Sequence, residues 1–534
     1  MSRKSCATGP KPGRKSPESL HSNKEDIMSR LNPKRMLLGA VFAALMTGGA
    51  LAQDRELVIA QGIDTPGFDI HNHSTSAVEA IHVNIFDYLV MRDQAGELQP
   101  ALATDWEQVS DSAMRFHLRE GVLFHDGTTM TAEDVKFSLE RPALDPAVLQ
   151  HSFYDTITEV EVVNDHEIII HTDGPDPILL NRISRIGSGI VPKAYVDEVG
   201  WEGFSQKPIG TGPFKVVEWL RDDRIIMEGF DEHWRGAPAW DRLIHRTIPE
   251  ASTRVGELIS GGVDIATNIP SQDRDRVEGS GIAHAVPWPS FRVMQLFLNT
   301  KDDSPLADPK VREAIDLAID NQMLIDTVTN GLGTPVRAAV TPGLSAVPMA
   351  YYDTYNFDPE RAVQLLEEAG YGPNELQLKL QGPAGRYPLD VETLEIVAVM
   401  LNAVGIQTEI ETLEWSAYES RVWTPNTIDG IALIGHANSL QDGYHAVQRA
   451  RCGFEFSLKT GWCNEEFDKL IEQSAATVDP EERAQQISDA FDLFVASNTV
   501  LHLFQVENLI GVSTSVDWSP SPDEQLWMYD AQPQ

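Results

Sequence analysis

The stretch that decides the fold lies between residues 114 and 138 and combines a strand, a tight turn and a helix. It reads Met114-Arg-Phe-His-Leu-Arg-Glu-Gly121, then Phe124-His-Asp-Gly127 and Thr131-Ala-Glu-Asp-Val-Lys-Phe-Ser138. Apolar and polar side chains alternate over 114–118, which predicts a half-buried strand. Asp126-Gly127 is typical of a turn. Thr131 with an acid three positions later predicts the start of a helix.

The chain on either side of this stretch is rich in strands up to about residue 300. Val58-Ile-Ala60 predicts an early strand. Thr156–Val163 and Glu167–His171 are β-branched runs on either side of Asn164-Asp165, which predicts a hairpin. This half therefore mixes strands with short helices.

The second half is more helical and repeats one helix-start signal. Asp308-Pro309, Asp358-Pro359 and Asp479-Pro480 each precede a helical pattern. The Asp side chain caps free N–H groups, and Pro occupies the first helical position, where no donor is needed. Strands over 376–380 and 407–413 flank a helix over 391–404, which indicates a three-layer α/β arrangement.

Composition and charge exclude several classes of function. The 534 residues include 42 Lys and Arg against 80 Asp and Glu, a net charge of -38. Such a chain repels the phosphates of nucleic acids and anionic membrane surfaces. Three cysteines exclude a disulfide-dense miniprotein or a cysteine-rich zinc protein.

Residues 1–52 are interpreted as a leader that ends in a signal peptide. Basic residues Lys34 and Arg35 precede the apolar run Met36–Met46, and Ala50-Leu51-Ala52 follows. A charged segment, a short apolar core and an A-x-A cleavage site are typical of secretion. The alternative, a membrane anchor, requires about 20 apolar residues. The mature protein is therefore expected in the periplasm of a Gram-negative cell.

Export changes the interpretation of the cysteines. Cys452 and Cys463 remain after cleavage and lie eleven positions apart. Two nearby cysteines in an oxidising compartment favour a disulfide. The alternative is a reactive thiol.

No common catalytic or cofactor motif is present. The sequence lacks His-Glu-x-x-His, Gly-x-Ser-x-Gly and Cys-x-x-Cys. Gly210-Thr-Gly-Pro-Phe214 is interpreted as a tight turn entering a strand, because Pro213 lacks the donor that a phosphate loop needs. His71 and His73 lie on one face of an extended segment, which leaves metal binding as an alternative to a structural role. We expect no cofactor, no bound metal and no catalytic residues.

Several stretches together resemble the family 5 extracellular solute-binding proteins, the dipeptide, oligopeptide and nickel receptors of ABC importers. The stretches are Leu98-Gln-Pro-Ala-Leu-Ala-Thr-Asp-Trp-Glu107, the three segments of 116–138, Gly210–Phe214, Asn299, Pro309, Val311-Arg-Glu-Ala314 and Ala318-Ile-Asp320. The pair Cys452 and Cys463 stands where many members have a disulfide. The resemblance covers about residues 55–530.

The resemblance implies an α/β, two-lobed periplasmic binding protein, class II-like and of cluster C, with three domains and a ligand cleft between the lobes. It implies hinge closure around a solute, most simply a peptide, and delivery by a monomeric receptor to an ABC permease and its ATPase. The implied boundaries are 1–52 for the leader, 53–85, 206–300 and 500–534 for domain I, 86–205 for domain II, and 301–499 for domain III.

The resemblance also suggests site residues. Arg386 matches the arginine that pairs with a peptide carboxylate in peptide-binding members, and Tyr387 follows it. In the loop 435–445, Ser439 stands where dipeptide receptors carry the aspartate that binds the peptide ammonium, and His436 replaces a tryptophan. Asn438 and Asp442 belong to the same loop. Trp288, Phe291 and Trp415 are candidate apolar walls.

The serine at position 439 weakens the case for dipeptides, because a buried ammonium without a carboxylate loses a strong interaction. Either Asp442 or another acid takes its place, or the solute has no free amine there. Two other functions stay open. One is a receptor for a metal chelate or another small organic solute, using His71, His73 or His436. The other is an exported hydrolase.

Overall fold

A computed structural model describes residues 55–534 except 74–75, 94–95, 186, 302, 385, 388 and 424–427. Residues 54–534 form one compact unit. The predicted leader and signal peptide, residues 1–52, lie outside the described residues. Among the described residues, no helix has both the length and the apolar character needed to cross a membrane.

One long mixed sheet runs through the unit in the strand order β15-β14-β16-β12-β17-β11-β1-β10-β9-β8, and β13 pairs with β17 at its side. The bounds of its strands are β1 Glu56–Gln61, β8 Phe214–Leu220, β9 Arg224–Gly229, β10 Arg242–Thr247, β11 Ile265–Ala266, β12 Ala283–Leu298, β13 Gly333–Pro335, β14 Leu376–Ala384, β15 Ile406–Glu414, β16 Ile431–Ala437 and β17 Val500–Ser513. The predicted strand at 58–60 is β1, and the predicted strands at 376–380 and 407–413 are β14 and β15.

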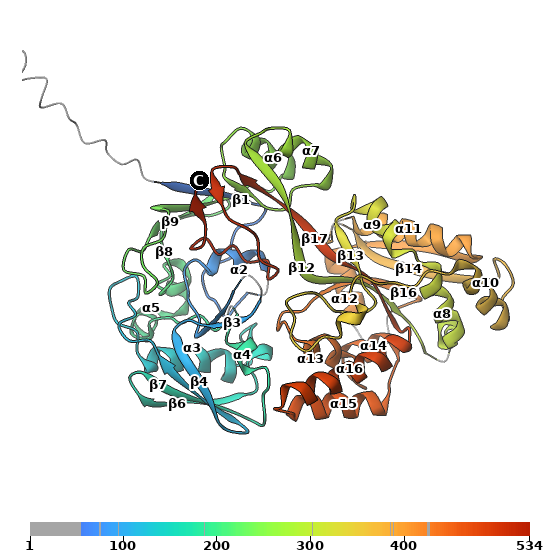
Figure 1. Cartoon of the computed structure of the whole chain (residues 1–534), viewed down its shortest axis with the longest axis horizontal. Helices are drawn as coiled ribbons and strands as arrows, with labels where there is room; N and C mark the ends of the chain where they lie inside the picture. The colour runs from blue at the N-terminus through green and yellow to red at the C-terminus, as the bar shows by residue number, and fades with distance from the viewer. Residues whose placement is uncertain are drawn as a thin grey trace, which may run out of the picture. The chain divides into compact units, whose positions relative to one another are not determined.

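Two long antiparallel strands, β12 and β17, divide this unit into two lobes (Figure 1). We call residues 55–282 and 514–534 the first lobe and residues 299–499 the second lobe. The pairing of β12 with β17 shifts between Pro289 and Val293. The two strands are the covalent connections between the lobes, so a relative motion of the lobes must bend or twist them.

The first lobe contains a second, four-stranded sheet in the order β4-β5-β7-β6. Its strands are β4 Ala103–Ser110, β5 Ala113–Leu118, β6 Ile157–Asn164 and β7 Glu167–Thr172, and smaller pairs join β2 Val90–Arg92 to β3 Leu98–Pro100 and β18 Val516–Asp517 to β19 Gln532–Pro533. The helices of the lobe are α2 Ser76–His82, α3 Ala132–Leu144, α4 Leu179–Arg182, α5 Lys193–Gln206, α6 Ala251–Ile259 and α7 Arg274–Glu278. The predicted strand, turn and helix of 114–138 are therefore confirmed as β5, a turn with Gly127 at positive φ, and α3.

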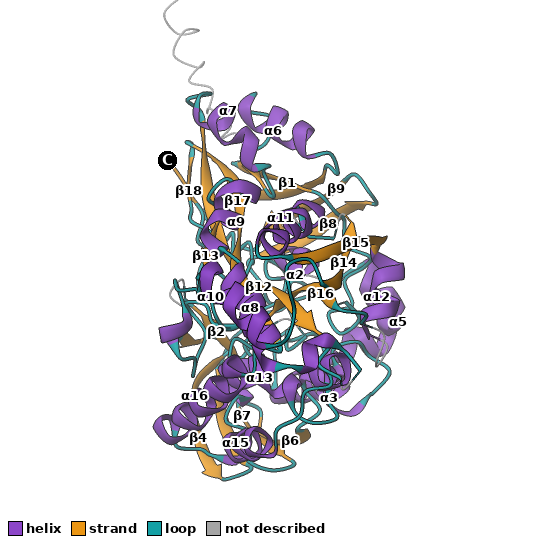
Figure 2. Ribbon diagram, turned by 90° about the vertical axis from the view of Figure 1, so that its right-hand side faces the viewer, coloured by secondary structure: helices purple, strands orange, loops and turns teal. Residues whose placement is uncertain are grey.

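The second lobe is rich in helices; this lobe faces the viewer in Figure 2, where helices are purple. Its helices are α8 Pro309–Ala318, α9 Asn321–Val328, α10 Pro359–Glu368, α11 Asp390–Ala403, α12 Trp415–Trp423, α13 Gly443–Val447, α14 Glu455–Thr460, α15 Glu465–Ala476 and α16 Pro480–Ala496. The three predicted Asp-Pro starts are confirmed, because Asp308, Asp358 and Asp479 each accept a backbone N–H of the first helical turn. The β14–α11–β15 unit is parallel, as the sequence predicts.

The glycine turn before β8 joins parts of the first lobe. A methyl group on Gly210 would come within 2.0 Å of the carbonyl oxygen of Ile85. The backbone N–H of Gly212 donates a hydrogen bond of 2.9 Å to that same oxygen. Only a residue without a side chain permits this approach, so the turn positions the chain between α2 and β2.

The disulfide between Cys452 and Cys463 is confirmed and encloses α14. Replacing both cysteines by serine is expected to lower the free energy of unfolding by about 2–3 kcal/mol, because the unfolded chain gains the freedom of an open loop. Thermal unfolding of the double variant, with and without reductant, checks this. Reductant should lower the stability of the natural protein and leave the variant unchanged.

Candidate functional site

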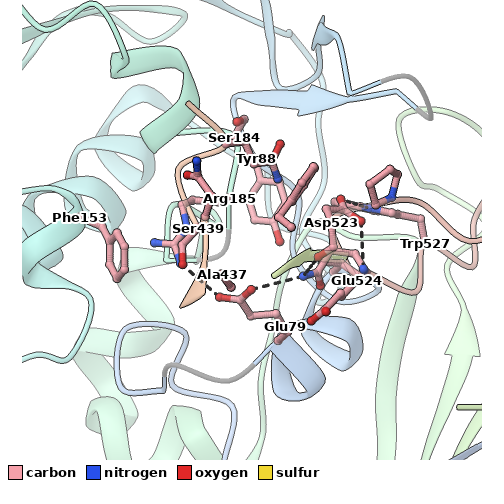
Figure 3. A pocket seen from close by; sticks show the side chains of 17 residues that line it. Glu79, Tyr88, Phe153, Ser184, Arg185, Ala437, Ser439, Asp523, Glu524 and Trp527 are labelled. Atoms are coloured by element: carbon pink, nitrogen blue, oxygen red, sulfur yellow. Dashed lines mark hydrogen bonds and ion pairs between the residues drawn. The ribbon is translucent and has the colours of Figure 1, made fainter. Parts of the chain in front are cut away.

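A cavity lies between the two lobes, next to the irregular crossing of β12 and β17 (Figure 3). It encloses about 760 Å³ of empty space, open solvent at its mouth included. The first lobe contributes α2, Arg185 and residues 522–527, and the second lobe contributes residues 437–441. Phe291, in the gap of the β12–β17 pairing, lines it as well.

Glu79 on α2 is the acid of the first-lobe wall that burial affects most. Its carboxylate contacts Arg185 at 3.4 Å and accepts a 3.3 Å hydrogen bond from the amide of Gln525. Burial raises the pKa of Glu79 to about 7; Arg185 opposes this rise, whereas the charges of Asp523 and Glu524 add to it. The negative charges of Asp523 and Glu524 therefore act on the carboxyl group of Glu79.

Arg185 is held in place from two sides. It donates to the side-chain oxygen of Gln150 at 3.0 Å, and its guanidinium lies 4.0 Å from the centre of the Phe153 ring. Phe153 and Arg185 both line the cavity. A guanidinium stacked on an aromatic ring keeps its orientation, which makes Arg185 a rigid part of the wall.

The segment 521–527 folds over the cavity through the side chain of Asp523. That carboxylate accepts hydrogen bonds from the Ser521 hydroxyl, the backbone N–H of Gln525 at 2.9 Å and the indole N–H of Trp527 at 3.1 Å. Glu524 adopts a φ of 62°. The turn thereby places Glu524, Gln525 and Trp527 in the cavity wall.

Three polar atoms of the wall have no hydrogen-bond partner among the described residues. They are the hydroxyl of Tyr88 and the side-chain oxygens of Gln441 and Gln525. Tyr88 is 2% exposed and Gln525 is 7% exposed. Burial of an unpaired polar atom costs free energy, so such atoms in a cavity wall indicate that a ligand completes their bonding.

The loop 437–441 of the second lobe contains two of the predicted site residues, Asn438 and Ser439. Both line the cavity. Asn438 is anchored, because its amide donates to the backbone oxygen of Asp442 at 2.8 Å. Asn181 of α4 donates to the backbone oxygen of Leu440 at 2.8 Å, which is a direct contact between the lobes at the edge of the cavity.

Asp442 does not line the cavity. Its carboxylate is 2.6 Å from the guanidinium of Arg483, accepts the Ser345 hydroxyl at 2.7 Å and caps α13 through the N–H of Tyr444 at 2.9 Å. The residue is 1% exposed. The hypothesis that Asp442 replaces the missing ammonium partner does not fit this position, because its acceptors are already used to hold the loop.

Arg386, Tyr387 and Trp415 form a group on the second lobe outside the cavity wall. The guanidinium of Arg386 lies 5.0 Å from the ring centre of Tyr387 and 5.1 Å from that of Trp415. Arg386 is exposed, whereas Tyr387 is buried and donates to the backbone oxygen of Gly435 at 3.2 Å. The structure therefore brings these three predicted residues together, next to β16.

The remaining predicted residues have structural surroundings. His436 contacts Gln295 at 3.1 Å and Glu455 at 3.2 Å, and burial lowers its pKa to about 4. Trp288 is buried, and its indole N–H donates to the backbone oxygen of Ser521 at 2.7 Å. Trp288 thus packs against the 521–527 segment and does not line the cavity, whereas Phe291 lines it.

His71 and His73 are buried within the first lobe. His71 contacts the guanidinium of Arg141 at 3.0 Å, and the ring of His73 lies 4.8 Å from that of His82. Neither lines the cavity between the lobes. Within the described residues, no group of three or more His, Cys, Asp or Glu side chains has an arrangement that holds a metal ion.

Sequence reasoning missed most of the first-lobe wall. Glu79, Tyr88, Arg185 and the segment 522–527 come from three distant parts of the chain. The only local signal is the turn-forming Ser521-Pro-Asp-Glu-Gln-Leu-Trp527, in which polar residues precede a tryptophan.

Comparisons with known proteins agree with this architecture. The profile of the bacterial extracellular solute-binding proteins, family 5 Middle, matches residues 97–443, more than half of the chain. Heme-binding protein A of Haemophilus influenzae is 29% identical over 423 residues, 74% of this chain and 76% of that protein. The dipeptide-binding protein of Escherichia coli K12 is 27% identical over 495 residues, 86% and 91% of the two chains.

The solved structure of HbpA2 from Haemophilus parasuis has the same fold. Its TM-score is 0.79 at 22% identity, covering 90% of this chain and 100% of that one. The two lobes joined by β12 and β17, the cavity between them and the profile match lead to one conclusion. The chain belongs to the family 5 bacterial extracellular solute-binding proteins, as its sequence motifs indicate.

Proposed function

We propose that the protein is a periplasmic receptor that captures a peptide between its lobes and delivers it to an ABC permease with its ATPase. The observation that carries the proposal is the cavity to which both lobes contribute polar side chains. A solute that contacts both lobes favours their closed arrangement, and the closed form is what a permease recognises. The related dipeptide-binding protein, which the chain matches over nearly its whole length, supports a peptide.

In this proposal the protein is a monomer and performs no chemistry on its solute. The wall combines hydrogen-bonding groups with aromatic side chains such as Phe153 and Trp527, which suits a peptide backbone with varied side chains. Arg386 is proposed to bind the peptide carboxylate when the solute is bound, because a guanidinium makes two parallel hydrogen bonds to a carboxylate. The Tyr387 and Trp415 rings orient it.

The protein purified from periplasm is expected to release peptides when it is denatured, and mass spectrometry identifies them. A defined peptide from this set should bind again with unit stoichiometry and unchanged mass. Replacing Arg386 by Ala should weaken that binding by about tenfold or more, because a charge-assisted contact is lost. Arg361→Ala, on the outer face of α10, is the control.

Other outcomes distinguish the alternatives. Release of a porphyrin or metal chelate, as the name of the Haemophilus influenzae relative suggests for that protein, excludes peptide capture and retains the receptor. Conversion of a bound peptide into smaller products identifies a hydrolase.

A further inference from the structure

We propose that the cavity binds a free ammonium group of its solute from the first lobe, with Glu524 as the principal carboxylate and Glu79 and Gln525 beside it. The inference rests on the proposed function and names the solute class: a peptide or other small molecule with an unblocked amine. Ser439 of the second lobe is uncharged and cannot form an ion pair with an ammonium group. In this proposal, Glu524 of the first lobe takes over the role of the acid that dipeptide receptors carry at the position of Ser439.

Of the three acids that line the cavity, Glu524 has no ion-pair partner among the described residues. Glu79 and Asp523 are the other two. Arg185 contacts Glu79, and the charge of Asp523 acts on Arg92 of β2. The carboxylate of Glu524 therefore attracts a positively charged solute group.

Of the three carboxylates, Glu524 has the most unused acceptor capacity. Asp523 accepts three hydrogen bonds within its own turn. Glu79 is engaged by Arg185 and Gln525. For Glu524 the described partner is the amide of Asn508 at 3.5 Å, which is a long contact.

Two atoms of the same wall, the side-chain oxygen of Gln525 and the hydroxyl of Tyr88, are free to accept hydrogen bonds. The amide nitrogen of Gln525 donates to the backbone oxygen of Asp523 at 3.0 Å and to Glu79 at 3.3 Å, which orients its oxygen as a free acceptor. The Tyr88 hydroxyl accepts a donor equally well. An ammonium group supplies three N–H donors, which are what carboxylate, amide and hydroxyl acceptors of this kind bind.

A metal ion fits this wall less well than an organic cation. The acids of the cavity are not among any described group of three or more side chains arranged to hold a metal ion. An ammonium group tolerates wider and less regular spacing, because each of its bonds is separate.

The purified protein is first freed of solute by unfolding and refolding. Its binding to three probes is then measured. They are a mixture of dipeptides and tripeptides, the same mixture with acetylated amino groups, and spermidine. Native mass spectrometry measures what binds. We expect acetylation to weaken binding by roughly 10- to 100-fold, the effect of losing hydrogen bonds to a charged group.

Each outcome separates the inference from the proposed function. Equal binding of free and acetylated peptides overturns the ammonium site and retains the peptide receptor. Binding of spermidine alone retains the ammonium site and overturns peptide capture. Binding of none of the probes overturns both.

Substitution of Glu524 tests whether this residue is the carboxylate that binds the ammonium group. Glu524→Gln should weaken binding of the free-amine peptides by roughly 10- to 100-fold and leave binding of acetylated peptides unchanged. A purely structural role would weaken both alike. Glu472→Gln removes the same charge from the exposed face of α15 and should change neither. Equal affinities of natural protein and Glu524→Gln for the free-amine peptides would exclude Glu524 as the partner.

Discussion

Acidification from about pH 7.5 to about pH 5 is expected to destabilise the protein strongly, because eight of its described histidines are buried in the neutral form. Burial lowers the pKa values of all eight from the ordinary value of 6.5. The value falls to about 3 for His71, His245 and His502 and to about 4 for His73, His125 and His436. It also lies well below 6.5 for His82 and His445. The unfolded chain therefore binds more protons than the folded chain below pH 6.5. The stability that is present above that pH is lost as the pH falls toward the folded values.

The magnitude makes this the largest expected effect. Each such histidine lowers the free energy of unfolding by about 1.4 kcal/mol per pH unit below pH 6.5. A few of them acting together remove a large part of a typical folding free energy of about 5–15 kcal/mol. Glu79 acts in the opposite direction between pH 4.5 and about 7, because its folded pKa is raised. Burial also raises the pKa values of Asp264, Asp316 and Glu507, so these acids offset part of the loss, but they are fewer than the histidines.

Thermal unfolding at several pH values measures the effect. The melting temperature should fall by at least about 5 °C between pH 7.5 and pH 5. His245, whose two ring nitrogens lack partners, provides the variant: His245→Leu should lose about 1.4 kcal/mol less per pH unit. His284, with its side chain 64% exposed, provides the control His284→Gln. A melting temperature that stays constant or rises toward pH 5 would contradict the prediction.

Removing the charge of Asp442 is expected to have the second-largest effect. Its carboxylate and the Arg483 guanidinium are both buried and are joined by two contacts of 2.6 Å and 3.0 Å. Asp442→Asn leaves Arg483 without a counter-charge in the interior. The free energy of unfolding should fall by about 3–5 kcal/mol.

Because the Asp442 carboxylate also accepts the Ser345 hydroxyl and the backbone N–H of Tyr444, the same variant should disturb the loop that lines the cavity and weaken solute binding. Urea unfolding and a binding measurement check both effects. Asp442→Leu combined with Arg483→Met should recover part of the stability, since no buried charge remains. Glu368→Gln breaks the exposed pair with Arg361 and should cost at most about 1 kcal/mol. Equal losses in the two single variants would show that the buried pair has no special role.

Local signals in the sequence predicted the elements well, because they depend on neighbouring residues. Asp308, Asp358 and Asp479 cap helices wherever those helices pack, and the glycines of 210–212 are required by one close backbone contact. The three-domain boundaries stay a prediction, since residues 54–534 form one compact unit.

The candidate site was only partly predictable. Asn438, Ser439 and Phe291, three of the candidate residues, line the cavity, and their role in binding stays a prediction. Asp442 lies outside the cavity wall in an ion pair with Arg483, which joins positions 41 residues apart, and no local pattern in the sequence marks such a pair.

Local patterns and spaced motifs were enough to predict the secondary structure, the disulfide and the family of the protein. The composition of the cavity wall could be found from the folded structure alone. Glu79, Arg185 and Glu524 meet there although more than 300 residues separate the last from the others. The physical reason is that a carboxylate without an ion-pair partner and unpaired hydrogen-bonding atoms are properties of a folded wall, and they arise only when distant segments exclude water together.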